Sequence, residues 1–161
     1  MTMSVYHIDP VASRETIVGQ GNFSLKTVDD LARALIATAS GVKVGVAMND
    51  GGLGITRTNG NDAALEKDAG RICHEIGAGH VFVCLVEKAF PINLLNDLFH
   101  VHGVVNIFAA TANPLDILVF ETEQGKAVLG AVDGRTPDKI ETAEDKEKRK
   151  ETLKRFGYPL G

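Results

Sequence analysis

Cysteine is scarce in this sequence, and so are long apolar runs. Only two of the 161 residues are cysteine, and neither Cys73 nor Cys84 belongs to a C-x-x-C pair. Two isolated cysteines exclude a disulfide framework, and their apolar neighbours predict buried free thiols. The apolar runs fall short of a membrane span, and the first residues lack a signal-peptide layout. We therefore expect a soluble, cytoplasmic protein with no membrane partner.

Acidic residues outnumber basic residues outside the C-terminal stretch of the chain. The stretch from Asp138 to Arg155 holds seven basic and six acidic residues, which leaves ten basic against fifteen acidic residues elsewhere. A nucleic-acid interface needs clustered lysine and arginine, so this balance predicts that no nucleic acid is a partner. A hydrophobic content of 44% with 24% charged residues is instead typical of a globular domain.

The hydrophobic pattern predicts a single α+β domain over residues 1–161. We expect a mixed, mostly antiparallel sheet with helices packed on it. Helical spacing marks residues 27–38, 61–76 and 91–102, with Thr27 capping the first helix. Strand patterns mark residues 42–47, 80–86, 104–110, 116–121 and 126–132, with weaker signals at 5–8 and 16–19. A charged helix is expected at about 142–156, exposed and docked by its last turn.

The loop Gly77–His80 is the first of four candidate binding segments. It joins a helix to an unbroken apolar strand, and Gly79 allows a ligand to approach the backbone closely. His80 could act as a general base, a nucleophile or a phosphate acceptor. A half-buried structural histidine is the alternative, and the sequence leaves both open.

Three further loops offer polar groups beside helix or strand ends. A helix start with N–H groups suits an anion, small residues near a turn leave space for a flat ligand, and a strand-end carboxylate suits ribose hydroxyls or a metal. Turn formation and helix capping explain the same residues without a ligand. The candidates are Asn61 and Asp62, Thr111 and Asn113, and Glu121 and Gln124.

Charge limits the ligand that the segment Gly77–Gly134 can accept. It contains six carboxylates but only Lys88 and Lys126 as bases, which would neutralise a triphosphate poorly. Either a metal such as Mg²⁺ bridges the charges, or the ligand is a nucleoside or monophosphate. The sequence has no phosphate-binding G-x-x-x-x-G-K-[ST] loop and no G-x-S-x-G elbow, and no metal-ligand spacing identifies a metal site.

Five strings in this order resemble the adenosine-specific kinase family. They are Ile76–His80, Ala89–Asn93, Ala110–Pro114, Glu121–Gly125 and Leu129–Gly134. The resemblance extends from about Gly19 to Tyr158. It implies an α+β fold, binding of adenosine or AMP, a homo-oligomer that is expected to be a trimer, and a phosphohistidine intermediate.

One position departs from the family pattern. The family has a histidine before the phenylalanine, where this sequence has Asn22 before Phe23. An amide is neither a base nor a useful nucleophile, so Asn22 cannot replace that histidine as a phosphate carrier, whereas His80 is retained. The leading hypothesis is a phosphotransferase that binds adenosine or AMP, with Mg²⁺ held by carboxylates. A non-catalytic adenosine or AMP sensor is the alternative, and an enzyme unrelated to nucleotides is the third.

Overall fold

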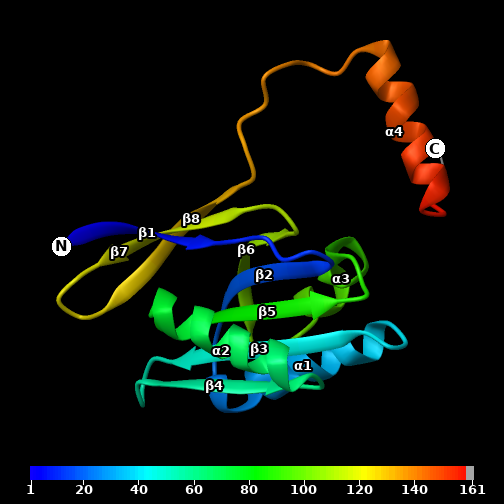
Figure 1. Cartoon of the computed structure of the whole chain (residues 1–161). Helices are drawn as coiled ribbons and strands as arrows, with labels where there is room; N and C mark the ends of the chain where they lie inside the picture. The colour runs from blue at the N-terminus through cyan, green and yellow to red at the C-terminus, as the bar shows by residue number, and fades with distance from the viewer. Residues whose placement is uncertain (159–161) are drawn as a thin grey trace.

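A computed structural model describes residues 1–158, which form eight strands in two antiparallel sheets together with four α-helices (Figure 1). The larger sheet has the order β4-β3-β5-β2-β6, formed by Ile55–Gly60, Lys43–Asp50, Val81–Glu87, Arg14–Gly21 and Val104–Thr111. The smaller sheet has the order β1-β7-β8, formed by Thr2–Ile8, Leu115–Glu121 and Lys126–Asp133. The predicted α+β class is confirmed, with the strands divided between two sheets.

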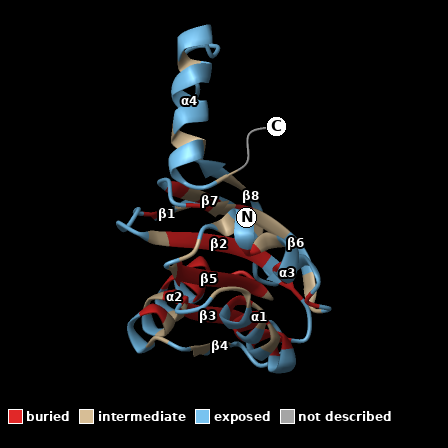
Figure 2. Cartoon of the chain, turned by 90° about the vertical axis from the view of Figure 1, so that its right-hand side faces the viewer, coloured by how far each residue is buried: buried red, intermediate tan, exposed pale blue. Residues whose placement is uncertain are grey.

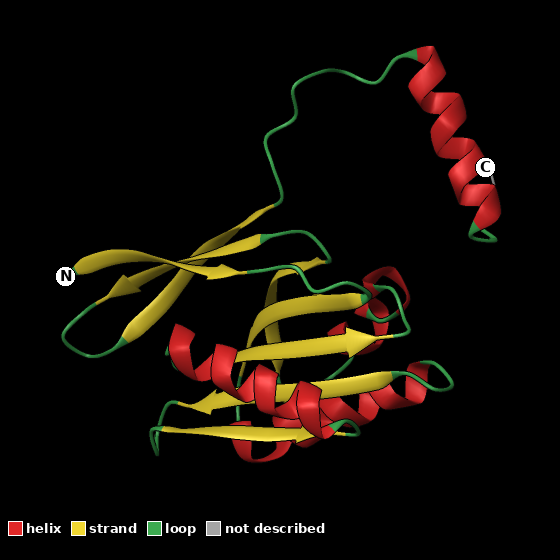
Figure 3. Ribbon diagram, in the orientation of Figure 1, coloured by secondary structure: helices red, strands yellow, loops and turns green. Residues whose placement is uncertain are grey.

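The five-stranded sheet is covered on both faces (Figure 3). Helix α1 (Ser24–Thr38), the 3₁₀ turn Pro91–Asn93 and the short α3 (Leu95–Phe99) lie on one face. Helix α2 (Ala63–Ile76) and the small sheet lie on the other. Buried residues therefore concentrate in the central strands, which Figure 2 shows in red. The apolar run of β5 is fully buried, as its sequence predicts for a central strand.

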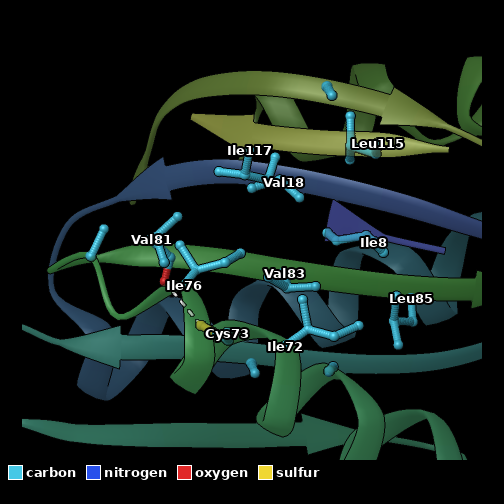
Figure 4. Packing of buried hydrophobic residues seen from close by; sticks show 14 of the residues in the cluster. Ile8, Val18, Ile72, Cys73, Ile76, Val81, Val83, Leu85, Leu115 and Ile117 are labelled. Atoms are coloured by element: carbon cyan, nitrogen blue, oxygen red, sulfur yellow. Dashed lines mark hydrogen bonds between the residues drawn. The ribbon is translucent and has the colours of Figure 1, made fainter. Parts of the chain in front are cut away.

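The core beneath the small sheet joins that sheet to the large sheet and to α2 (Figure 4). Ile117 of β7 packs toward Val18 of β2. Ile72 of α2 belongs to the same buried cluster, on the same face of the large sheet. Cys73 and Cys84 are both free and buried, as predicted. Burial raises the pKa of the Cys73 thiol to about 12, which makes it an inert core residue at neutral pH.

Helix α2 begins and ends where the sequence indicates. The Asp62 side chain accepts hydrogen bonds from the Ala64 and Leu65 amides, and Gly77 ends the helix with a left-handed φ of 69°. The amide of Gly77 donates to the carbonyl of Cys73 at 3.1 Å. This fixed C-terminus carries the chain directly into the Gly77–His80 loop.

The first helix departs from its predicted start. It begins at Ser24, three residues before Thr27, and its N-cap residue Phe23 provides no side-chain hydrogen bond. The Thr27 hydroxyl donates to the Asn22 carbonyl at 2.6 Å instead of accepting from helix amides. The capping prediction for Thr27 is therefore wrong, because this hydroxyl binds the preceding loop.

Two other details differ from the sequence-based prediction. Strand β4 was not expected, since its polar sequence lacks an apolar alternation; pairing with β3 forms it. The third predicted helix is divided into a 3₁₀ turn and α3, because a hydrogen-bonded turn at Leu94 interrupts it. Leu98 is buried there, but Phe99 and His102, which share its helical face in the sequence pattern, are exposed.

Helix α4 (Ala143–Arg155) stands away from the body at the end of an extended segment (Figures 1 and 2). The predicted capping box between Thr142 and Asp145 is present, and no residue of the helix is buried. The last turn contacts the body through Phe156, whose ring centroid lies 5.9 Å from that of Phe90. Residues 159–161 of the predicted domain lie outside the described residues. Across residues 1–158, no helix has the length and apolar character needed to cross a membrane.

Candidate functional site

A cleft of about 730 Å³ opens where the two sheets and the C-terminus of α2 meet. One wall is the turn between β3 and β4, with Asn49, Asp50 and Thr56. The floor is the end of α2 and the following loop, and the opposite wall is the β7–β8 hairpin. The residues contributed by floor and hairpin are His74, Gly77, Gly79, His80, Thr122, Gln124, Gly125, Lys126 and Ala127. A cleft of this size matches the range of small-molecule sites.

Asn49 holds these parts together from a buried position at the end of β3. Its amide nitrogen donates to the carbonyls of Cys73 and Ala78, both at 2.9 Å. Its amide oxygen accepts from the Thr56 hydroxyl at 2.7 Å. One side chain therefore connects the β3–β4 hairpin, the last turn of α2 and the Gly77–His80 loop.

Asp50 shapes the turn that forms the first wall. Its carboxylate accepts from the Gly52 and Leu53 amides at 2.9 Å, and from the Ser24 hydroxyl and Arg57 guanidinium at 2.8 Å. The Leu53 amide, then Arg57 and Ser24, hold the pKa of Asp50 well below its usual range. These donors keep the carboxylate ionised and occupied, so it braces the wall and is not available as a general base.

His80 occupies the turn between the loop and β5 in a strained backbone conformation. Its φ is 58°, a left-handed value that is uncommon outside glycine, and its carbonyl accepts from the Gly21 amide at 2.9 Å. The ring lies against the β3–β4 turn, since a methyl group built on Gly51 would meet its Nδ1 and Cε1 at 3.1 Å. His80 lines the cleft, and among residues 1–158 no hydrogen bond to its ring is present.

Lys126 and His74 place a lysine side chain and an imidazole beside the same space. The Lys126 side chain lies over Gly77, where an added Cβ would meet its Cδ at 3.3 Å and its Nζ at 3.5 Å. An isolated backbone β-bridge between Ala78 and Lys126 holds the β7–β8 hairpin against the Gly77–His80 loop. The His74 Nδ1 lies 3.3 Å from the Thr56 hydroxyl, which connects it to Asn49.

The structure changes the charge balance that the sequence suggested. None of the six carboxylates between Gly77 and Gly134 lines the cleft, whereas Lys126 does. Asp50 is the lining carboxylate, and Arg57 neutralises it at 2.8 Å. The surface available to a ligand is therefore neutral to positive, which suits a phosphate better than the sequence count indicated.

The same side chains do not fit a resident magnesium ion. Magnesium needs oxygen ligands with free lone pairs, and the Asp50 oxygens already accept from four groups. Among residues 1–158, no group of three or more His, Cys, Asp or Glu side chains has a metal-binding arrangement.

The residues predicted from sequence fall into three places. Gly79, His80 and Gln124 line the cleft together. Asn61 and Asp62 lie at the far end of α2, roughly 20 Å away by the length of a 14-residue helix. There Asp62 caps the helix and pairs with Lys43 at 2.9 Å, while Asn61 bonds the backbone of Val42 and Val44.

Thr111 and Asn113 form a separate group at the β6–β7 turn. Thr111 accepts from the Asn113 amide at 3.0 Å, and the Asn113 side chain donates to Asp133 at 3.0 Å. This group lies at the opposite end of β7 from Gln124, roughly 20 Å along a seven-residue strand. Glu121 ends that strand, exposed and opposite Lys126 in the β7–β8 register, but it does not line the cleft.

Sequence reasoning missed Asn49, Asp50, Thr56, His74 and Lys126 as cleft residues. A usable signal exists for two of them, because Asn49 and Asp50 precede Gly51-Gly52 at the end of an apolar strand. His74 lies one turn before the predicted helix end at Gly77. Thr56 and Lys126 needed the strand pairing, which the sequence did not reveal.

The chain matches known proteins over nearly its whole length. Residues 7–159 match the model of the family described as adenosine specific kinase. The crystal structure of the PH1918 protein from Pyrococcus horikoshii OT3 is 46% identical, with a TM-score of 0.92 and coverage of 99% of this chain and 100% of that one. A search of curated proteins gives no match.

The likeness to the Pyrococcus structure extends to the C-terminal segment. Residues 135–158 are more than a seventh of the 161 residues, so a superposition that failed there could not reach a TM-score of 0.92. Much of the segment that carries α4 therefore takes a similar position in the solved structure.

We expect Asn49→Asp to lower the free energy of unfolding by about 2–3 kcal/mol at pH 7, because a carboxylate cannot donate to the Cys73 and Ala78 carbonyls. Urea denaturation measures this change. The matched control is Thr56→Val, which removes the hydroxyl bonded to the Asn49 oxygen and should cost about 1 kcal/mol. Equal effects of the two variants would contradict the bridging role of Asn49.

Asp50 should make stability depend on acid pH. Its folded-state pKa is depressed, so its contribution is complete above the unfolded value of about 3.9 and is lost as pH falls below that value. Thermal unfolding at pH 7 and pH 3 should show a smaller drop for Asp50→Asn than for the wild-type protein. Parallel pH profiles would show that the ion pair with Arg57 contributes little.

The chain thus has a cleft of about 730 Å³ lined by His80 and Lys126, and its residues 7–159 match the family model. The chain belongs to the adenosine-specific kinase family.

Proposed function

We propose that the cleft beside Asn49 binds adenosine or AMP and that the protein transfers a phosphoryl group to adenosine. The observation that carries this proposal is the free His80 ring beside Lys126 and His74 in a cleft of about 730 Å³. Family membership supports an adenosine-related ligand. The low negative charge around the cleft supports a phosphorylated one.

The geometry supports a division of the cleft between base and phosphate. Gly51, Gly54 and Ile55 offer backbone and apolar surface on the β3–β4 turn, where a flat ring can lie. Lys126, His74 and His80 lie at the floor and hairpin, where a phosphate would find the lysine ammonium and imidazole nitrogens. In this arrangement the 5′ end of the nucleoside points toward His80.

His80 is the proposed phosphate carrier. A ring nitrogen attacks the terminal phosphorus of a nucleoside triphosphate donor, the N–P bond forms, and the P–O bond to the nucleoside diphosphate leaving group breaks. The adenosine 5′-hydroxyl then attacks the phosphorus, loses its proton to solvent or His74, and releases the imidazole. Any Mg²⁺ in the proposal arrives with the phosphates of the donor, since the protein carboxylates do not fit it.

A non-catalytic adenosine or AMP sensor is the second candidate. Asn22 stands where the family pattern has a histidine, and the Gly21 amide beside it bonds the His80 carbonyl at 2.9 Å. A histidine at position 22 would therefore come close to the His80 loop, and this chain lacks it. The occupied carboxylate of Asp50 also leaves the cleft without a free acidic base.

We also propose a cytoplasmic homotrimer, as the family resemblance implies. Sedimentation equilibrium of the purified protein tests the assembly by its mass.

Lys126→Ala should weaken AMP binding about tenfold and leave adenosine binding within twofold, because only AMP carries a phosphate for the lysine. Isothermal calorimetry measures both. The matched control is Lys67→Ala, an exposed lysine of α2 outside the cleft, which should change neither affinity. Loss of adenosine and AMP affinity by the same factor would remove Lys126 from the phosphate side, and failure of both ligands to bind would reject the proposed ligand.

Labelled ATP separates the two candidate functions. With adenosine present, a phosphotransferase yields labelled AMP, and His80→Ala should lower that yield at least about 10³-fold because the nucleophile is gone. His100→Ala, on an exposed residue outside the cleft, is the control and should keep full activity. A wild-type protein that gives neither labelled AMP nor phosphoprotein is a sensor. Full activity of His80→Ala would exclude His80 from the mechanism.

A further inference from the structure

The small sheet leaves a largely apolar face uncovered. Leu115, Ile117 and Val119 of β7 point into the core, so the alternate residues Asp116, Leu118 and Phe120 point outward. Asp116 bonds His7 of β1, and the other two are apolar. Their partners on β1 are Val5 and Met3, which are 59% and 66% exposed. We call the face formed by Met3, Val5, Leu118, Phe120 and Val132 the outer sheet face. In Figure 1 α4 stands to the side of the small sheet, and no helix or strand of residues 1–158 lies over this face.

The segment that follows this sheet has little of its own chain to pack on. We call residues 135–158 the C-terminal arm. Ile140 is 93% exposed, α4 has no buried residue, and the ring contact between Phe156 and Phe90 is the aromatic contact that ties the arm to the body. A helix of 13 residues is marginal in water without tertiary packing. The position of the arm therefore needs a surface that one copy of the chain does not supply.

The stand-off position of the arm is not peculiar to this chain, because much of the arm must overlay in the 46% identical solved structure to reach its TM-score of 0.92. A position held by both proteins calls for a common stabilising contact. An unpacked helix would have no physical reason to occupy the same place.

Charge favours a second copy as the source of that contact. Helix α4 holds six basic and four acidic residues, while the chain as a whole carries −4, so the rest of the chain is acidic. The arm of one copy is thus attracted to the body of another. Each copy carries both an arm and an outer sheet face, so reciprocal contacts can close into a symmetric assembly without a different partner.

We propose that the C-terminal arm of one copy packs on the outer sheet face of a neighbouring copy, with Ile140 as its apolar anchor. This inference specifies the surface of the proposed homo-oligomer and is independent of the ligand. The exchange would cover the exposed side chains of β1 and β8 and give α4 the packing that its own chain lacks.

The test uses the full-length protein without ligand, examined by light scattering and sedimentation over a range of concentrations. Ile140→Asp and Val5→Asp should each raise the dissociation constant of the assembly at least tenfold and shift the mass toward one chain. Both side chains are exposed, so circular dichroism should show an unchanged fold. Leu25→Asp is the matched control, because it adds the same charge to an exposed residue of α1 and should leave the mass unchanged.

Hydrogen exchange of the wild-type protein gives a second readout that needs no variant. Amides of α4 should be protected in the assembled protein and lose protection on dilution to single chains. Three results would overturn the proposal: a wild-type mass of one chain at every concentration, an unchanged mass for both interface variants, or α4 protection that persists in single chains. The last result would mean that the arm packs on its own body. Adenosine binding can fail while these results hold, so the two proposals are tested separately.

Discussion

The cleft depends on one buried amide. Asn49 donates to Cys73 and Ala78 and accepts from Thr56, so the end of α2, the loop that carries His80 and the β3–β4 hairpin share a single anchor. An amide has both the donors and the acceptor that this junction requires, and no isosteric side chain has both. Left-handed backbone at Gly77 and His80 then turns the chain sharply back into β5. The strained conformation of His80 is tolerated because these surrounding bonds fix it.

This anchor also determines the electrostatics of the cleft. It brings His74 and His80 to the same floor, and the Ala78–Lys126 bridge adds a lysine from the second sheet. Asp50 is neutralised by Arg57, so the cleft presents Lys126 without a free carboxylate. A phosphorylated adenosine fits that balance, and the proposed phosphoryl transfer uses the His80 ring as its nucleophile. The sites of ligand binding and of proposed assembly are separate, because the outer sheet face points away from the core that supports the cleft.

Local sequence signals predicted the elements that local forces form. The cap at Asp62, the stop at Gly77, the apolar run of β5 and the turn Thr122–Gly125 all lie where the pattern placed them. Strand β4 escaped prediction because pairing with β3, and not an apolar alternation, forms it. For the site, His80, Gly79 and Gln124 could be predicted from their loops. Thr111 and Asn113 could not be separated from them, since only the direction of β7 places the two groups at opposite ends. Lys126 required the contact between two sheets.

A crystal structure of the adenosine complex would show whether the space beside Asn49 is the adenosine site. We expect density for the nucleoside between the β3–β4 turn and the β7–β8 hairpin, with the ribose 5′-oxygen directed at His80. Density at the β6–β7 turn, against Asn113 and Asp133, would contradict it.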